Sequence, residues 1–81
     1  MRPGTVDETA AITIAKRAVA SNDTWAERAV YEARSDGSGW SVTAYRIEGY
    51  DSSGKPNFVF GGDRTIHINE TGAVTSYVRG L

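Results

Sequence analysis

The strongest constraint on the fold is the alternation along residues 40–47, Trp-Ser-Val-Thr-Ala-Tyr-Arg-Ile. In an extended chain, Trp40, Val42 and Ala44 point to one side, while the intervening residues point to the other. A period of two with aromatic and β-branched residues is typical of a half-buried strand. We therefore predict a central strand here, with the rest of the chain arranged to cover its Trp40 side.

A helix is predicted before this strand. Residues 5–8, Thr-Val-Asp-Glu, form a capping box in which the Thr5 hydroxyl accepts from the Glu8 N–H and the Glu8 carboxylate reaches back. Alanine and isoleucine then recur on one broad helical face as far as about Ala20. Residues 21–23, Ser-Asn-Asp, are expected to end the helix.

Residues 24–34 fit two patterns. Trp25, Ala29 and Ala33 have helical spacing, whereas Ala29, Tyr31 and Ala33 would share one face of a strand. We favour a strand from about Arg28. The Gly- and Asp-rich stretch at 35–39 then predicts a hairpin that leads into the central strand.

The second half of the chain predicts a polar loop and two more strands. Residues 49–57 are expected to be the loop, with its tip at 51–54 and with Pro56 unable to donate to a strand ladder. An apolar run resumes at 58–60, and Gly61-Gly62 after it indicates a bulge or a close backbone approach.

A terminal hairpin is expected after this interruption. Strands at 65–69 and 73–79 flank a turn in which Gly72 suits a positive φ. Val74 and Val78 are predicted to point inward.

One helix followed by four antiparallel strands predicts an α+β fold, with the helix packed on a four-stranded meander sheet in two layers. The length of 81 residues fits a single domain spanning 1–81. The side chains expected to form the core are Ile14, Ala18, Tyr31, Trp40, Val42, Ala44, Ile66, Ile68, Val74 and Val78.

Composition excludes several functional classes. The net charge of −1 provides no basic face for nucleic acid. No apolar run reaches the roughly 20 residues of a membrane helix. The N-terminus has no apolar signal core, so the chain as numbered is expected to be cytoplasmic. If Met1 replaces a removed signal peptide, the protein would be periplasmic or secreted.

The polar residues do not form a recognisable catalytic or metal motif. His67 is the single histidine and has no paired nucleophile, so we expect it on the surface. Asp36, Asp51 and Asp63 lie in separate segments without metal-ligand spacing. The glycine pairs do not open a helix after a strand, as a phosphate cradle would. We therefore expect a protein that is not an enzyme and has no metal or cofactor.

The outer face of the predicted sheet is the best candidate for a binding site. Tyrosine and arginine are enriched in protein interfaces, and alternation assigns both residue types to this face, with apolar area added by Val30 and Ile47. An ordinary solvated sheet face remains the alternative. The proposed partner-binding residues are Arg28, Glu32, Tyr45, His67, Tyr77 and Arg79.

Four segments together carry a family resemblance. They are Ala-Ala-Ile-x-Ile-Ala at 10–15, Asp-Gly-x-x-Trp-x-Val at 36–42, Gly-Gly at 61–62, and Ile-x-Ile-Asn-Glu-Thr-Gly-x-Val at 66–74. This arrangement resembles the small bacterial immunity proteins with a nuclear-transport-factor-like fold, which neutralise polymorphic toxins. The Trp strand and terminal hairpin also resemble PepSY-type peptidase-propeptide domains. Both resemblances imply a cystatin-like helix-plus-sheet architecture and a protein partner.

The expected function is that of a small non-enzymatic protein-binding module that occludes a bacterial toxin or a peptidase. Two alternatives stay open. The same face could pair with itself in a homodimer of no enzymatic activity, or the chain could be a PepSY-type domain that regulates a peptidase.

Overall fold

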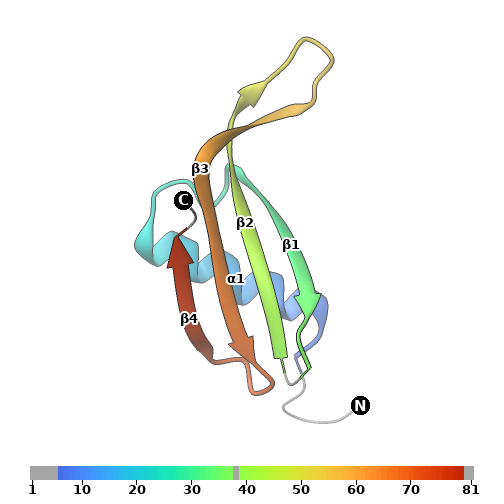
Figure 1. Ribbon diagram of the computed structural model, residues 1–81, viewed down its shortest axis with the longest axis vertical. Coiled ribbons are helices and arrows are strands. Elements are labelled where there is room, and N and C mark those ends of the chain that lie inside the picture. The colour runs from blue at the N-terminus through green and yellow to red at the C-terminus, as the bar shows by residue number, and fades with distance from the viewer. Residues whose placement is uncertain (1–5, 38, 80–81) are drawn as a thin grey trace.

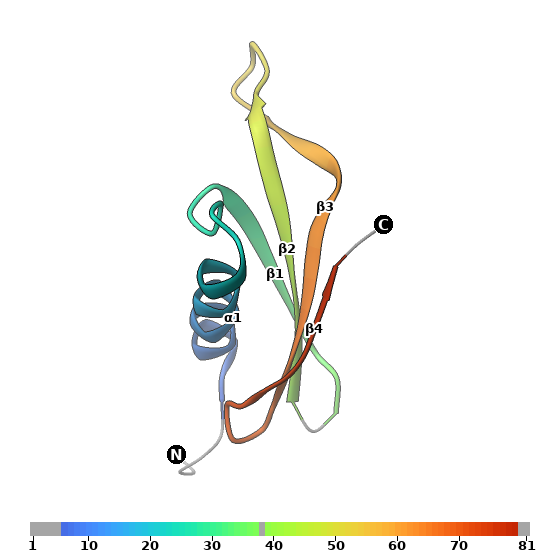
Figure 2. The same cartoon turned by 90° about the vertical axis from the view of Figure 1, so that its left-hand side faces the viewer.

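The computed structural model describes residues 6–37 and 39–79, without the side chains of residues 60 and 61. The elements are α1 (Glu8–Asn22), β1 (Ala29–Ser35), β2 (Gly39–Tyr50), β3 (Pro56–Asn69) and β4 (Val74–Arg79). The strands form one antiparallel sheet in the order β1-β2-β3-β4, and α1 lies across one of its faces (Figures 1 and 2). The predicted α+β fold of a helix on a four-stranded meander is confirmed. Within the described ranges, no helix is long and apolar enough to cross a membrane.

The core lies between α1 and the sheet. Small residues on the helix allow it to approach the strands closely, and the larger side chains of β2 and β3 fill the space beneath it. The buried set is Ala11, Ala15, Val19, Trp25, Ala26, Val42, Ala44, Ile66 and Ile68. Trp40 packs at the margin of this set rather than at its centre, and its indole Nε1 donates to the Val6 carbonyl at 2.7 Å.

The helix ends differ slightly from those predicted. Thr5, the expected cap, lies outside the described residues, and the N-cap is Asp7, whose carboxylate accepts from the Ala10 N–H at 2.8 Å. The helix continues to Asn22, and the backbone N–H of its C-cap, Asp23, donates to the Val19 carbonyl. The favoured interpretation of residues 24–34 is confirmed, because β1 begins at Ala29.

The predicted orientation of β4 is wrong. Ile68 pairs with Val74 but His67 pairs with Ser76, so Thr75 is an extra residue on β4 at a register shift. Such an insertion reverses the alternation of the residues that follow. Val78 is consequently 50% exposed, whereas Tyr77 packs against the core. Val74 precedes the extra residue and pairs with Ile68, and it is 42% exposed rather than buried.

The loop predicted at 49–57 is shorter in the structure and occupies residues 51–55. β2 continues to Tyr50 and pairs with Pro56, the first residue of β3, where a missing N–H is tolerated. β1 pairs no further than Arg46 and β4 no further than Arg64, so β2 and β3 run on together. Residues 47–58 thus form a two-stranded ribbon, the arm, which projects beyond α1 (Figures 1 and 2).

A register shift separates the arm from the body of the sheet. Tyr45 pairs with Asp63, but Ile47 pairs with Phe58. Gly62 lies within this irregularity, and a Cβ there would come within 2.9 Å of the Val59 Cβ. The close approach predicted for the Gly-Gly pair is therefore present at Gly62.

The turns at the arm tip and between β3 and β4 share one construction. In each, an Asx Oδ1 accepts hydrogen bonds of 2.7 to 3.0 Å from the backbone N–H groups two and four residues later and from a hydroxyl two residues later. The acceptors are Asp51 and Asn69. A glycine at positive φ completes each turn, Gly54 at 86° and Gly72 at 92°, which confirms the prediction for Gly72.

The core and the β4 register can be tested with two substitutions. Ile66→Ala should lower the free energy of unfolding by about 2–5 kcal/mol, because Ile66 is fully buried. Val78→Ala should change it by less than about 0.5 kcal/mol, because Val78 lies on the solvated face. Urea denaturation of both variants gives the comparison, and a large cost for Val78→Ala would show that β4 has the opposite register.

The arm turn can be tested at Asp51. Its pKa lies below the usual value because the Ser53 hydroxyl and the Lys55 N–H donate to the carboxylate. Asp51→Asn should keep the Lys55 amide protected from hydrogen exchange, since Asn69 performs the same role in the other turn. Asp51→Ala should accelerate that exchange. In the unsubstituted protein, protection should be complete above the ordinary Asp pKa and should fall as the pH drops through the lowered value, whereas the Asn variant should not respond.

Candidate protein-interaction surface

The outer face of the sheet, opposite α1, carries three of the six predicted binding residues. Glu32 lies on β1 opposite Thr43, Tyr45 lies on β2 between Val30 and Asp63, and His67 lies on β3 opposite Ser41. These positions alternate with the buried residues of the same strands. No other element of the described chain covers this face (Figure 2).

Tyr77 and Arg79 were assigned to the wrong face. The extra residue at Thr75 rotates both positions to the helix side of the sheet. The Tyr77 hydroxyl there donates to Asp23 Oδ2 at 2.6 Å. Arg79 pairs in register with Arg64, whose guanidinium also reaches Asp23. Neither residue can contribute to a patch that contains Tyr45.

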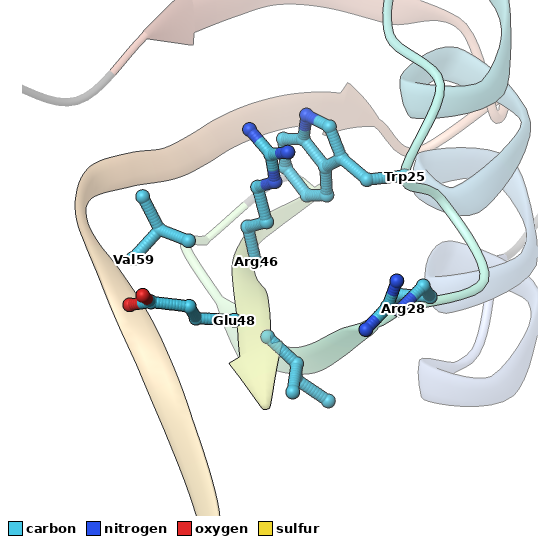
Figure 3. A pocket seen from close by; sticks show the side chains of 6 residues that line it. Trp25, Arg28, Arg46, Glu48 and Val59 are labelled. Carbon is cyan, nitrogen blue, oxygen red and sulfur yellow. The ribbon is translucent and has the colours of Figure 1, made fainter. Parts of the chain in front are cut away.

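Arg28 lies at the end of the sheet from which the arm projects. It precedes β1, and its carbonyl accepts from the Ile47 N–H at 2.8 Å. Its exposed side chain lines a pocket at the base of the arm, apart from Glu32 and His67 (Figure 3).

An apolar patch on the outer face begins beside this position. The rings of Tyr45 and Phe58 have centroids 5.8 Å apart and are inclined at 58°. Ile47 pairs with Phe58, and Val30 pairs with Tyr45. Phe58 is 46% exposed and Val30 is 39% exposed. Val30, Tyr45, Ile47 and Phe58, which we call the apolar patch, therefore join three strands at the base of the arm.

Phe58 is the member of this patch that sequence reasoning missed. The sequence predicted only that an apolar run resumes at residues 58–60, and it assigned this run to neither face, because the pairing of Phe58 with Ile47 depends on the irregularity beside Gly62. The available signal was an aromatic residue at the start of this apolar run, two positions after Pro56.

The opposite end of the outer face is polar. His67 Nδ1 lies 3.6 Å from Asp36 Oδ2, and Arg34 lies 3.7 Å from Glu32. All four side chains are well exposed, so these two contacts contribute little to stability. The outer face thus grades from apolar at the arm to charged at the far end.

A polar cluster on the helix side fixes the end of α1 to the sheet. Asp23, the C-cap of α1, accepts from Tyr77 and from Arg64 Nε at 3.2 Å, and the Arg64 guanidinium lies over the Trp25 ring, 5.3 Å from its centroid. The Tyr77 hydrogen bond, followed by Arg64, lowers the pKa of Asp23 against the opposing effect of burial. Burial and the hydrogen bond to Asp23 raise the pKa of Tyr77 to about 12. These groups are partners of one another and form a structural clamp.

The pocket at the base of the arm has a volume of about 130 Å³ and is lined by Trp25, Arg28, Arg46, Ile47, Glu48 and Val59 (Figure 3). This volume is below the roughly 300–1,000 Å³ of ordinary small-molecule sites. Among residues 6–37 and 39–79, no three acidic or histidine side chains gather closely enough to hold a metal ion.

Comparisons of the chain with protein-family models, curated proteins and solved structures gave no match.

The clamp predicts a specific response to Tyr77→Phe, which removes only the hydroxyl. Loss of a hydrogen bond to a carboxylate should lower the free energy of unfolding by about 1–3 kcal/mol at pH 7. Because the folded-state pKa of Tyr77 is raised above the ordinary 10, its contribution is present below pH 10 and is lost as the pH rises toward 12. The wild-type and variant stabilities should therefore converge between pH 10 and 12. Tyr45→Phe, which removes a hydroxyl from the outer face, is the matched control and should show no such convergence.

Proposed function

We propose that this protein is a small protein-binding module that attaches to a partner through its apolar patch and occludes part of the partner's surface. The observation that carries the proposal is the gathering of Val30, Tyr45, Ile47 and Phe58 on the uncovered sheet face, where the arm leaves the body.

The chemistry of the patch favours a protein surface as its partner. Aromatic side chains held against neighbours lose little conformational entropy on binding and commonly act as energetic anchors. Tyr45 and Phe58 already touch, and cross-strand partners hold both of them. A polar margin with Glu32 and Asp63 borders the patch, as in interfaces that have an apolar centre and a charged rim.

The proposed mode of action is occlusion rather than catalysis. A patch of aromatic and aliphatic side chains supplies contact area, not acid–base groups. The sequence resemblance to bacterial immunity proteins and to PepSY-type domains supports a toxin or a peptidase as the partner class.

A homodimer is the second candidate, and one feature favours it. Val30, Tyr45 and Phe58 lie on three adjacent strands of the uncovered sheet face. A continuous apolar surface of this kind can pair with the same surface of a second copy about a two-fold axis.

The two candidates are separated by substitution within the patch. A photo-crosslinking residue at position 58, with one at exposed position 13 on α1 as control, identifies what contacts the patch in cells. For the purified complex, Phe58→Ser and Tyr45→Ala should each weaken binding by more than about 1 kcal/mol, as anchor residues do, whereas Thr13→Ala should not.

Self-association is measured in parallel. If the patch pairs with itself, the midpoint of thermal unfolding should rise with protein concentration, and Phe58→Ser should abolish that rise. If position 58 crosslinks to nothing more than position 13 does, and the midpoint is independent of concentration, the apolar patch is an ordinary solvated surface and the proposal is wrong.

A further inference from the structure

The pocket at the base of the arm lies on the helix side of the sheet. Arg46 pairs with Ala29, which packs against the core, so the Arg46 side chain shares the face occupied by α1. Trp25, in the segment between α1 and β1, forms one wall, and Val59 contributes from β3. The apolar patch lies on the opposite face, and Ile47 stands at the rim between the two sites.

Three charged side chains line this pocket without pairing with one another. Arg64 is held by Asp23, and Arg34 lies beside Glu32. Among the residues that the structure describes, Arg28, Arg46 and Glu48 form no ion pair, although all three line the same small space. The pocket therefore carries a net positive charge.

The geometry in Figure 3 spreads these charges around the opening. The Arg46 guanidinium lies beside the Trp25 indole, and the Arg28 side chain lies across from Glu48 and Val59. A ligand that enters would meet a cation on two sides and apolar surface between them. Guanidinium groups bind carboxylates and phosphates alike in a planar, two-pronged geometry. Of these two anions, the carboxylate is the one that unmodified protein side chains carry.

The volume limits what can enter. About 130 Å³ accommodates one side chain and not a peptide or a nucleotide. A ligand of that size with a carboxylate at its end and methylene groups behind it is a glutamate or aspartate side chain.

We infer that this pocket receives one acidic side chain of a protein partner, with its carboxylate on Arg28 and Arg46 and its aliphatic part against Trp25 and Val59. Glu48 opposes this ligand and lowers its affinity. The base of the arm thus offers two separate contacts, an apolar one on the outer face and one for a carboxylate on the helix face. The pocket deepens the proposed function, because it specifies a partner with an acidic residue beside its contact surface.

The test uses the whole protein and a capped eight-residue peptide of alternating glutamate and alanine, with lysine and glutamine versions of the same peptide. Binding is followed by ¹⁵N–¹H NMR at the Trp25 indole and the arginine Nε groups, which report directly on the pocket walls. The glutamate peptide should produce saturable shifts there, and the glutamine peptide should not.

Substitution of the arginines and substitution of Glu48 should change the affinity for the glutamate peptide in opposite directions. Arg28→Gln and Arg46→Gln should each weaken binding of the glutamate peptide about three- to tenfold, the range for a partly exposed charged contact. Glu48→Gln should strengthen it. Arg46→Lys should fall between Arg46→Gln and wild type, because the charge remains and the planar fork is lost. Arg17→Gln on α1 and Glu70→Gln in the β3–β4 turn make the same changes of net charge and should have no effect.

Several outcomes would overturn the inference. They are tighter binding of the lysine peptide, an equal loss in Arg17→Gln, or no saturable shift at Trp25. Tyr45→Ala, within the apolar patch, should leave peptide binding unchanged. The peptide titration requires no natural partner, so it tests the pocket alone. The crosslinking experiment tests the apolar patch, and either proposal can therefore be rejected without the other.

Discussion

The packing of a single alanine-faced helix on one side of the sheet determines the rest of the structure. Ala11 and Ala15 let α1 lie close to Val42, Ala44, Ile66 and Ile68, so one layer of aliphatic side chains forms the centre of the core. A helix of 15 residues is about 22 Å long, whereas the 14 residues of β3 can extend about 46 Å. One helix cannot cover strands of that length. The outer face and the end of the β2–β3 ribbon are therefore left exposed.

The difference in length between α1 and β3 explains why the apolar patch and the pocket both lie at the base of the arm. A two-stranded ribbon is marginally stable in water by itself, so the arm depends on what holds its base. On the helix side that support comes from Trp25, which is buried beneath Arg64, and from Val59, which lies against Gly62. On the outer face it comes from the Tyr45–Phe58 contact. The same side chains that hold the arm to the body thus remain partly available at its base.

The alternation at residues 40–47 and the Asn-Glu-Thr-Gly turn were sufficient to predict the sheet, because both depend on local chemistry. The face of β4 was not predictable in the same way. Whether Val78 or Tyr77 points inward depends on Thr75 being left out of the ladder, and the sequence 74–78 alternates equally well in either register. The observed register is selected by a non-local interaction, the hydrogen bond from Tyr77 to Asp23, which lies 54 residues away in the chain. Trp25 was missed as a core residue for a similar reason, since its neighbours include Arg64 of β3, which is distant in the chain.

The arginines show how environment decides the role of a residue type. Arg64 is nearly enclosed, and an enclosed guanidinium must have a carboxylate partner, which Asp23 supplies; the pair anchors the helix. Arg28 and Arg46 are exposed, so water satisfies them and no internal partner is required. Their free donors can therefore be used in recognition at little cost to folding. A carboxylate that displaces water from them would be held in a setting partly shielded by Trp25, where the attraction is stronger than on an open surface. The sequence alone does not separate these two kinds of arginine, because the distinction arises only when β3 brings Arg64 under the end of α1 and β2 leaves Arg46 at the base of the arm.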